Sequence, residues 1–182
     1  MKKYFEAYKP FLAFLVKFIL SYAILGLLYK YYLSFYNSIP FEVDFITQEV
    51  ANQTQKLISF LGYQAEQFPH LKQKSIKLFV NGVYVARVVE GCNAISVILL
   101  FCSFIIAFKG KLKSTLLFIV MGSLLIYFLN VVRIALVAIA LLHYPKYEHF
   151  IHGVVFPLII YGIVFLLWVV WVTKFSVHGK KS

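Results

Sequence analysis

Charged side chains are scarce in this sequence of 182 residues, and acidic ones are the scarcest. The chain is 14% charged, with 7 acidic against 18 basic residues, whereas a soluble domain has about 25% charged residues. This shortage excludes a soluble globular fold. Cysteine is also rare, because Cys92 and Cys102 are too few for a disulfide framework. On one helix they would lie about 15 Å apart, beyond bridging distance, so both thiols are expected to be free.

Apolar residues make up 62% of the chain and gather in long runs. About 20 consecutive apolar residues cross the hydrocarbon core of a bilayer as a helix. The sequence therefore predicts an all-α integral membrane protein, a single polytopic membrane domain over residues 1–182 with about four transmembrane helices. The predicted spans cover about residues 10–33, 93–108, 114–143 and 153–173.

The one sizeable polar segment is the loop of residues 34–91, and two elements can be predicted inside it. Apolar residues recur at helical spacing over residues 43–61, which predicts an amphipathic helix lying on the membrane. Residues 76–80 and 83–88 alternate in the manner of strands on either side of Asn81-Gly82, a dipeptide that favours a tight β-hairpin. The hairpin leads directly into the second span.

Lysine and arginine indicate the orientation in the membrane. They cluster at the start of the chain, at residues 109–113 and in the tail from residue 174, and positive residues are retained on the cytoplasmic side. We therefore expect both termini in the cytoplasm and the loop of residues 34–91 outside the cytoplasmic (inner) membrane. The net charge of +11 then reflects orientation in lipid rather than nucleic-acid binding.

This topology places three reactive side-chain types at one outer surface. Cys92 begins the second span, Arg133 lies about 28 Å from the cytoplasmic end of the third, and His149 and His152 occupy the turn before the fourth. A thiol nucleophile, a proton-transferring imidazole and a cation for the oxyanion suit acyl transfer without a cofactor or metal. Chemistry alone does not separate His149 from His152, which are three residues apart.

Neighbouring polar residues could support this site, and each also has a plainer interpretation. Asn130 lies one turn before Arg133 on the same helix face, and Asn93 follows the cysteine. Arg133 could snorkel to the interface, although arginines within a membrane are costly and mark functional sites by default. Glu90 either pairs with Arg133 or Arg87 or is simply solvated, and a cysteine in an apolar helix usually only packs.

Three short segments in this order resemble the exosortase/archaeosortase superfamily. They are Glu90–Ala94, Asn130–Ile134 and His149–Phe156, each at the outer end of a span. The short chain is similar to the compact XrtF type. Members of the superfamily are polytopic membrane cysteine proteases or transpeptidases. They act on the C-terminal sorting signal of exported proteins, which consists of a motif, a transmembrane helix and a basic tail.

The resemblance implies catalytic roles for Cys92, Arg133 and His149, the last selected by its spacing to Gly153. It implies an active site that faces the periplasm, and sorting-signal substrates and membrane lipid as partners. Many members carry Cys-Ser-Gly or Cys-Thr-Gly where this chain has residues 92–94. Typical members are also longer with more spans, so this chain would correspond to the catalytic core or work with a small membrane partner protein.

Two other functions fit the same residues. The first is a non-catalytic scaffold of an export system, in which Arg133 and Glu90 merely pair between helices. The second is a soft-metal site or permease that uses Cys92 and His149, since thiolate and imidazole suit copper or zinc. Against a metal stand the single cysteine at the site, the lack of a Cys-x-x-Cys motif and the lack of carboxylates inside the spans.

Overall fold

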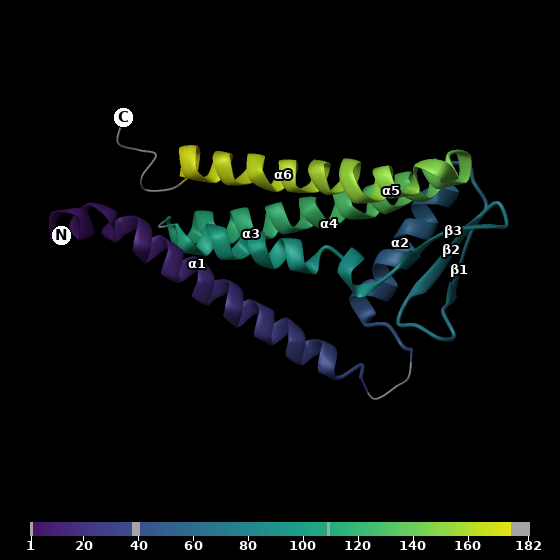
Figure 1. Cartoon of the computed structure of the whole chain (residues 1–182), viewed down its shortest axis with the longest axis horizontal. Helices are drawn as coiled ribbons and strands as arrows, with labels where there is room; N and C mark the ends of the chain where they lie inside the picture. The colour runs from purple at the N-terminus through teal and green to yellow at the C-terminus, as the bar shows by residue number, and fades with distance from the viewer. Residues whose placement is uncertain (1, 38–40, 109, 176–182) are drawn as a thin grey trace.

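The computed structural model describes residues 2–37, 41–108 and 110–175, apart from the side chains of residues 2–7, 152 and 156 (Figure 1). The described chain is mostly helical, with one small antiparallel sheet. Its elements are, in order, α1 (Lys2–Ser34), α2 (Phe45–Phe60), β1 (Ala65–Pro69), β2 (Ile76–Val80), β3 (Val83–Val88), the 3₁₀ turn η1 (Glu90–Cys92), α3 (Ile95–Ala107), α4 (Leu112–His143), the 3₁₀ turn η2 (Pro145–Tyr147), α5 (Glu148–Phe150), the π-helical turn η3 (Ile151–Val155), α6 (Phe156–Val170) and the π-helical turn η4 (Trp171–Phe175).

Three helical stretches are long and apolar enough to cross a membrane. They are Tyr8–Ser34, Leu112–His143 and Pro145–Phe175, and they match three of the four predicted spans. The predicted span at residues 93–108 corresponds to α3, which has 13 residues. At 1.5 Å per residue α3 rises about 20 Å, less than the ~30 Å of hydrocarbon that a spanning helix crosses. A crossing by α3 is therefore not confirmed and stays a prediction.

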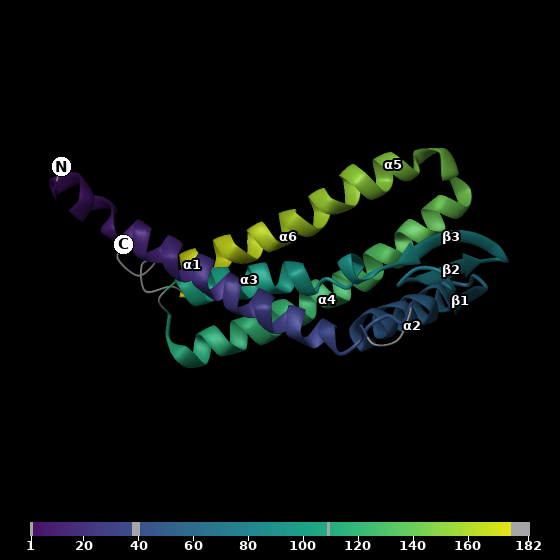
Figure 2. The ribbon, with the colours of Figure 1, turned by 60° about the horizontal axis from the view of Figure 1, so that its bottom comes forward.

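The long helices lie against one another, and the sheet occupies one end of the molecule (Figures 1 and 2). Helix α3 packs against α1 and α4, and α6 packs against α4 and α3. The start of α1 and the end of α6 both lie at the end remote from the sheet (Figure 1). Within the bundle the fit is tight at Gly122 of α4, where a Cβ atom would come within 2.4 Å of the Phe101 ring on α3.

The predicted hairpin is present with the predicted bounds. Strands β2 and β3 pair in antiparallel register around Asn81 and Gly82, whose φ angles of 52° and 75° are the left-handed values that a tight hairpin turn requires. Strand β1 was not predicted, because Ala65–Pro69 is short, polar and ends in proline. It pairs with the other side of β2, so the strand order is β1-β2-β3 and β3 forms one edge of the sheet.

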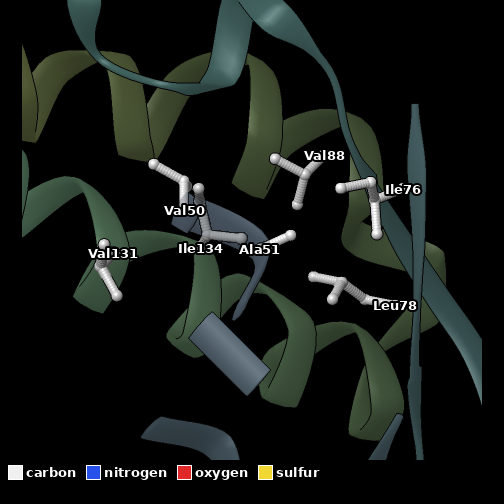
Figure 3. Close-up of a cluster of buried hydrophobic side chains, with 7 residues drawn as sticks. All are labelled: Val50, Ala51, Ile76, Leu78, Val88, Val131 and Ile134. Atoms are coloured by element: carbon white, nitrogen blue, oxygen red, sulfur yellow. The ribbon is translucent and has the colours of Figure 1, made fainter. Parts of the chain in front are cut away.

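Helix α2 begins directly after Asp44, whose carboxylate accepts hydrogen bonds from the Ile46 and Thr47 backbone N–H groups at 3.0 and 3.1 Å. The apolar face of α2 was expected to lie on the membrane. Instead the middle of this face is buried by protein, because α2 packs against α4 and the sheet, and Val50 and Ala51 are 0% exposed. Phe45 and Leu61 at its two ends remain exposed. Figure 3 shows this core, which joins α2, the strands and α4 through Val50, Ala51, Ile76, Leu78, Val88, Val131 and Ile134.

Candidate active site

Cys92 lies in the short connection between β3, the last strand of the sheet, and helix α3. After β3 the chain forms the single 3₁₀ turn η1, in which the Cys92 N–H donates to the Val89 carbonyl at 2.8 Å. Ala94 then adopts a left-handed conformation with φ of 66°, and α3 begins at the next residue. This conformation is unfavourable for residues other than glycine, so the backbone at Ala94 must be stabilised by its surroundings.

Asn93 supplies much of that stabilisation, because its side chain is 1% exposed and fully engaged. Its Oδ1 accepts from the Ile95 N–H at 3.0 Å, which caps the start of α3. Its Nδ2 donates to the Tyr29 hydroxyl at 2.8 Å and to the Thr47 hydroxyl at 3.1 Å. The residue after the cysteine therefore ties α3 to both α1 and α2.

The network continues to Asp44, which is 4% exposed. The Thr47 hydroxyl donates to Asp44 Oδ2, and the Tyr32 hydroxyl lies 3.5 Å from Asp44 Oδ1. One carboxylate thus caps α2 and receives a hydroxyl from α1 at the same time. Asp44, Thr47 and Tyr29 were missed in the sequence, although an aspartate at the start of an amphipathic stretch is a recognisable N-cap signal.

The other side of Cys92 is fixed by α4. Asn130, which is 1% exposed, donates from Nδ2 to the Cys92 carbonyl at 2.7 Å. Its Oδ1 accepts from Arg133 Nη1 at 3.3 Å. A single amide therefore links the cysteine backbone and the guanidinium, as the shared helix face of Asn130 and Arg133 suggested. Arg133 Nε is buried and has no hydrogen-bond partner among the described residues.

Cys92 and Arg133 also line one cavity of about 540 Å³. Both the volume and the mostly apolar lining are typical of a ligand pocket. The cavity lies between β3, the C-terminal part of α4 and the turn that follows α4. Its lining consists of Val83, Tyr84, Val85, Ala86, Arg87, Cys92, Arg133, Ile134, Val137, Leu141, Leu142, Pro145 and Glu148. Arg87, Pro145 and Glu148 were not identified from the sequence.

The two histidines lie at the same end of the molecule as this cavity, in the segment after α4. His149 is exposed and directly follows the lining residue Glu148, but it is not itself among the lining residues. His152 belongs to the π-helical turn η3, and its side chain lies outside the described residues. The structure therefore brings Cys92 and Arg133 to one cavity and places His149 beside its rim.

Glu90 pairs with neither arginine that the sequence suggested. Among the described residues, Arg133 contacts Asn130 and Arg87 contacts Gln73. Glu90 instead borders a small separate pocket that also contains Asp44 and Lys74. Partial burial raises the pKa of the Glu90 carboxyl, nearby Asp44 raises it further, and Lys74 opposes both effects. Glu90 is thus placed to interact with the network around Asp44 rather than with the reactive side chains.

Cys102 lies on α3 with its sulfur 3.7 Å from the Ser123 hydroxyl of α4, and it packs in the bundle core. Both cysteines are free, as predicted. In the part of the chain that the structure describes, no three His, Cys, Asp or Glu side chains come together as a metal site would require.

Comparison with known proteins identifies the family. No curated protein and no solved structure matches the chain significantly. The family model described as transmembrane exosortase (Exosortase_EpsH) matches residues 4–172, which is nearly the whole chain and includes every helix and strand that borders the cavity. The residues that suggested the exosortase resemblance therefore lie inside a match that covers far more than those motifs, and the chain belongs to the transmembrane exosortase family.

Proposed function

We propose that this protein is a membrane-embedded cysteine protease or transpeptidase that processes the C-terminal sorting signal of exported proteins. The observation that carries the proposal is that Cys92 and Arg133 line the same cavity. The buried Asn130 side chain forms hydrogen bonds to both residues. A nucleophile and a cation fixed beside one pocket are the elements that acyl transfer needs. Membership of the exosortase family supports a sorting-signal substrate.

In the proposed reaction His149 accepts the proton of the Cys92 thiol, the sulfur attacks the scissile carbonyl carbon, and the carbonyl oxygen becomes an oxyanion. Arg133 stabilises that oxyanion through its guanidinium N–H groups. Collapse of the intermediate breaks the C–N bond, and His149 delivers a proton to the leaving amine. The thioester left on Cys92 is then cleaved by water, or by an acceptor amine in a transpeptidation, and the thiol is regenerated.

The hydrogen bonding of Arg133 fits this role. Its Nη1 is held by Asn130, while its buried Nε lacks a partner among the described residues. A buried donor without an acceptor is costly in the resting protein, and a substrate oxyanion would satisfy a donor of this side chain. His149 is exposed and directly follows Glu148, which lines the cavity, and this position supports its proposed role as the proton donor to the leaving group.

The proposal also includes the location of the protein, its orientation in the membrane and its type within the family. We place the protein in the cytoplasmic membrane with both termini inside and the cavity facing the periplasm. Lysines cluster in the sequence next to the start of α1 and the end of α6, and these two helix ends lie at the end of the bundle remote from the sheet (Figure 1). We also propose that the protein belongs to the compact XrtF type of the family. Such a chain would act on its substrate in contact with lipid, alone or with a small membrane partner protein.

The test is intact-mass analysis of a co-expressed reporter that ends in a motif, a transmembrane helix and a basic tail. The wild-type chain should shorten the reporter or transfer it to an acceptor, and Cys92→Ala should leave it intact. Cys102→Ala is the matched control, because the second thiol packs in the bundle core. If Cys92→Ala still processes the reporter, the cysteine mechanism is wrong, and a scaffold role becomes the better explanation.

The same assay separates the two histidines. We expect His149→Ala to abolish processing at normal protein level and His152→Ala to reduce it modestly. A dead His152 variant beside an active His149 variant would show that the proton-transfer role was assigned to the wrong residue. If both variants are active, histidine-assisted catalysis is wrong for this protein.

A further inference from the structure

The strand that borders the cavity has a free edge. β3 lies at the side of the sheet nearest α5, and β2 is its neighbour on the other side (Figure 2). Within the described chain, the hydrogen bonds of the β3 backbone are those of its ladder with β2. An edge strand presents N–H and C=O groups that another extended chain can pair with.

The cavity follows this edge rather than one face of the sheet. Five consecutive residues, Val83–Arg87, line it. Side chains alternate between the two faces of a regular strand, so a cavity over one face would contact every second residue. The register of β2 with β3 is irregular at Val85, which has no partner on β2, but one such irregularity does not bring all five side chains to one face. Contact with all five indicates that the cavity runs along the backbone itself. Five residues of strand extend over about 17 Å, which is the length of a short extended peptide.

The opposite wall of the cavity has a similar length. On α4 the lining residues begin at Arg133 and end at Leu142, nine residues later. At 1.5 Å per residue they extend over about 14 Å of the helix. Between these ends the wall is apolar, formed by Ile134, Val137 and Leu141. The groove thus offers hydrogen-bonding backbone on one side and apolar side chains on the other. Cys92 follows the last residue of β3, Val88, by four positions in the chain.

We propose that the substrate segment before the scissile bond binds in this groove as an added strand on β3, parallel to it. This inference rests on the proposed function. β3 runs toward Cys92, and a sorting-signal substrate enters its transmembrane helix after the cleaved bond. The bound segment must therefore point its carboxyl end toward Cys92, which is the direction of β3. Main-chain pairing supplies affinity in this binding mode, and alternate side chains supply specificity.

The proposal is tested by disulfide crosslinking between the full-length protein and the sorting-signal reporter. The protein carries Cys92→Ala and Cys102→Ala, which leave it without native thiols. A single cysteine is then introduced by Val83→Cys or by Ala86→Cys. A set of reporters is also made, each with a single cysteine at one of the successive residues just before the mapped cleavage site. Glu66→Cys, an exposed position on the other edge strand β1, is the matched control.

Each introduced cysteine should crosslink strongly to one or two reporter positions, whereas Glu66→Cys should give background. The preferred position should move about three residues toward the cleavage site from Val83→Cys to Ala86→Cys. A shift in the opposite direction, or crosslinking no stronger than at Glu66, overturns the parallel added strand when the wild-type chain processes the same reporter. If the wild-type chain processes no sorting-signal reporter, the proposed function itself fails.

Discussion

Replacing Asn130 by leucine tests whether the hydrogen bonds of one buried amide position the reactive cysteine. Leucine has the same number and branching of side-chain heavy atoms as asparagine, so it is the apolar residue closest in shape, although its methyl groups are bulkier than the amide. The substitution removes the 2.7 Å bond to the Cys92 carbonyl and the 3.3 Å bond to Arg133 Nη1. Asn130 is 1% exposed, so water cannot easily replace the lost partners.

The expected loss follows from the cost of an unsatisfied buried group. A carbonyl left without its donor costs about 1–3 kcal/mol. If that cost falls on the productive position of Cys92, the processing rate decreases about 5- to 150-fold, since 1.36 kcal/mol corresponds to a factor of ten. Asn130→Asp should show a comparable loss, because it retains an acceptor for Arg133 but replaces the donor to Cys92 by an oxygen.

Two measurements distinguish misplacement of Cys92 from general destabilisation. The first is single-turnover processing of the reporter. The second is the alkylation rate of Cys92 by a small electrophile in a Cys102→Ala background, which should change in the Asn130 variants. Ser123→Ala, two turns earlier on α4, is the matched control and should retain wild-type rates, because the Ser123 hydroxyl faces Cys102. Wild-type processing and alkylation by Asn130→Leu would refute the positioning role, and an equal loss in Ser123→Ala would assign the effect to the helix as a whole.

Three further predictions address topology, chemistry and packing. A membrane-impermeant maleimide added to intact spheroplasts should label Cys92 and not Cys102, and labelling that persists in Cys92→Ala but vanishes in Cys102→Ala would overturn the orientation. Arg133→Lys should lose most processing activity although it keeps the charge, because a point charge does not replace a planar fork of directed donors; a fully active lysine variant would leave only an electrostatic role. Gly122→Ala should destabilise the detergent-solubilised protein by about 1–3 kcal/mol, since its Cβ would lie 2.4 Å from a ring carbon of α3. Gly162→Ala on α6, where no atom lies within 4 Å of the added Cβ, should not lower the thermal midpoint, and equal losses in both variants would contradict the packing argument.

The elements that were predicted correctly have strong local signals. Residues 76–88 alternate around Asn81-Gly82, and both turn residues have the positive φ that this dipeptide tolerates. Three of the four predicted spans match helices long and apolar enough to cross a membrane, because bilayer thickness sets the length of the apolar run directly. The amphipathic pattern of residues 43–61 predicted α2 but not its partner, because an apolar helix face is equally suited to lipid and to protein. Its burial against α4 is a tertiary contact that periodicity alone does not reveal.

Sequence reasoning predicted a depth in the membrane for each candidate site residue, but not the contacts between these residues. Helical rise placed Arg133 near the outer end of its span, and the structure gives it a cavity shared with Cys92. The cavity itself depends on where β3 lies against α4, through contacts between residues about fifty positions apart in the chain. No local sequence pattern encodes a contact between residues so far apart in the chain. The same reason explains why Glu148 was missed while its neighbour His149 was selected.

The Cys92-Asn93-Ala94 segment shows how the departure from the family pattern is accommodated physically. Many exosortases have glycine at the third position, where this chain has Ala94 at φ of 66°, a conformation that costs a residue with a Cβ about 1–2 kcal/mol. Asn93 compensates by capping α3 and by bonding to Tyr29 and Thr47, so the strained turn is held from three helices. A turn held by these hydrogen bonds keeps the Cys92 backbone in one position beside the cavity. The unusual alanine is therefore compatible with a fixed nucleophile because the neighbouring asparagine is buried and fully hydrogen-bonded.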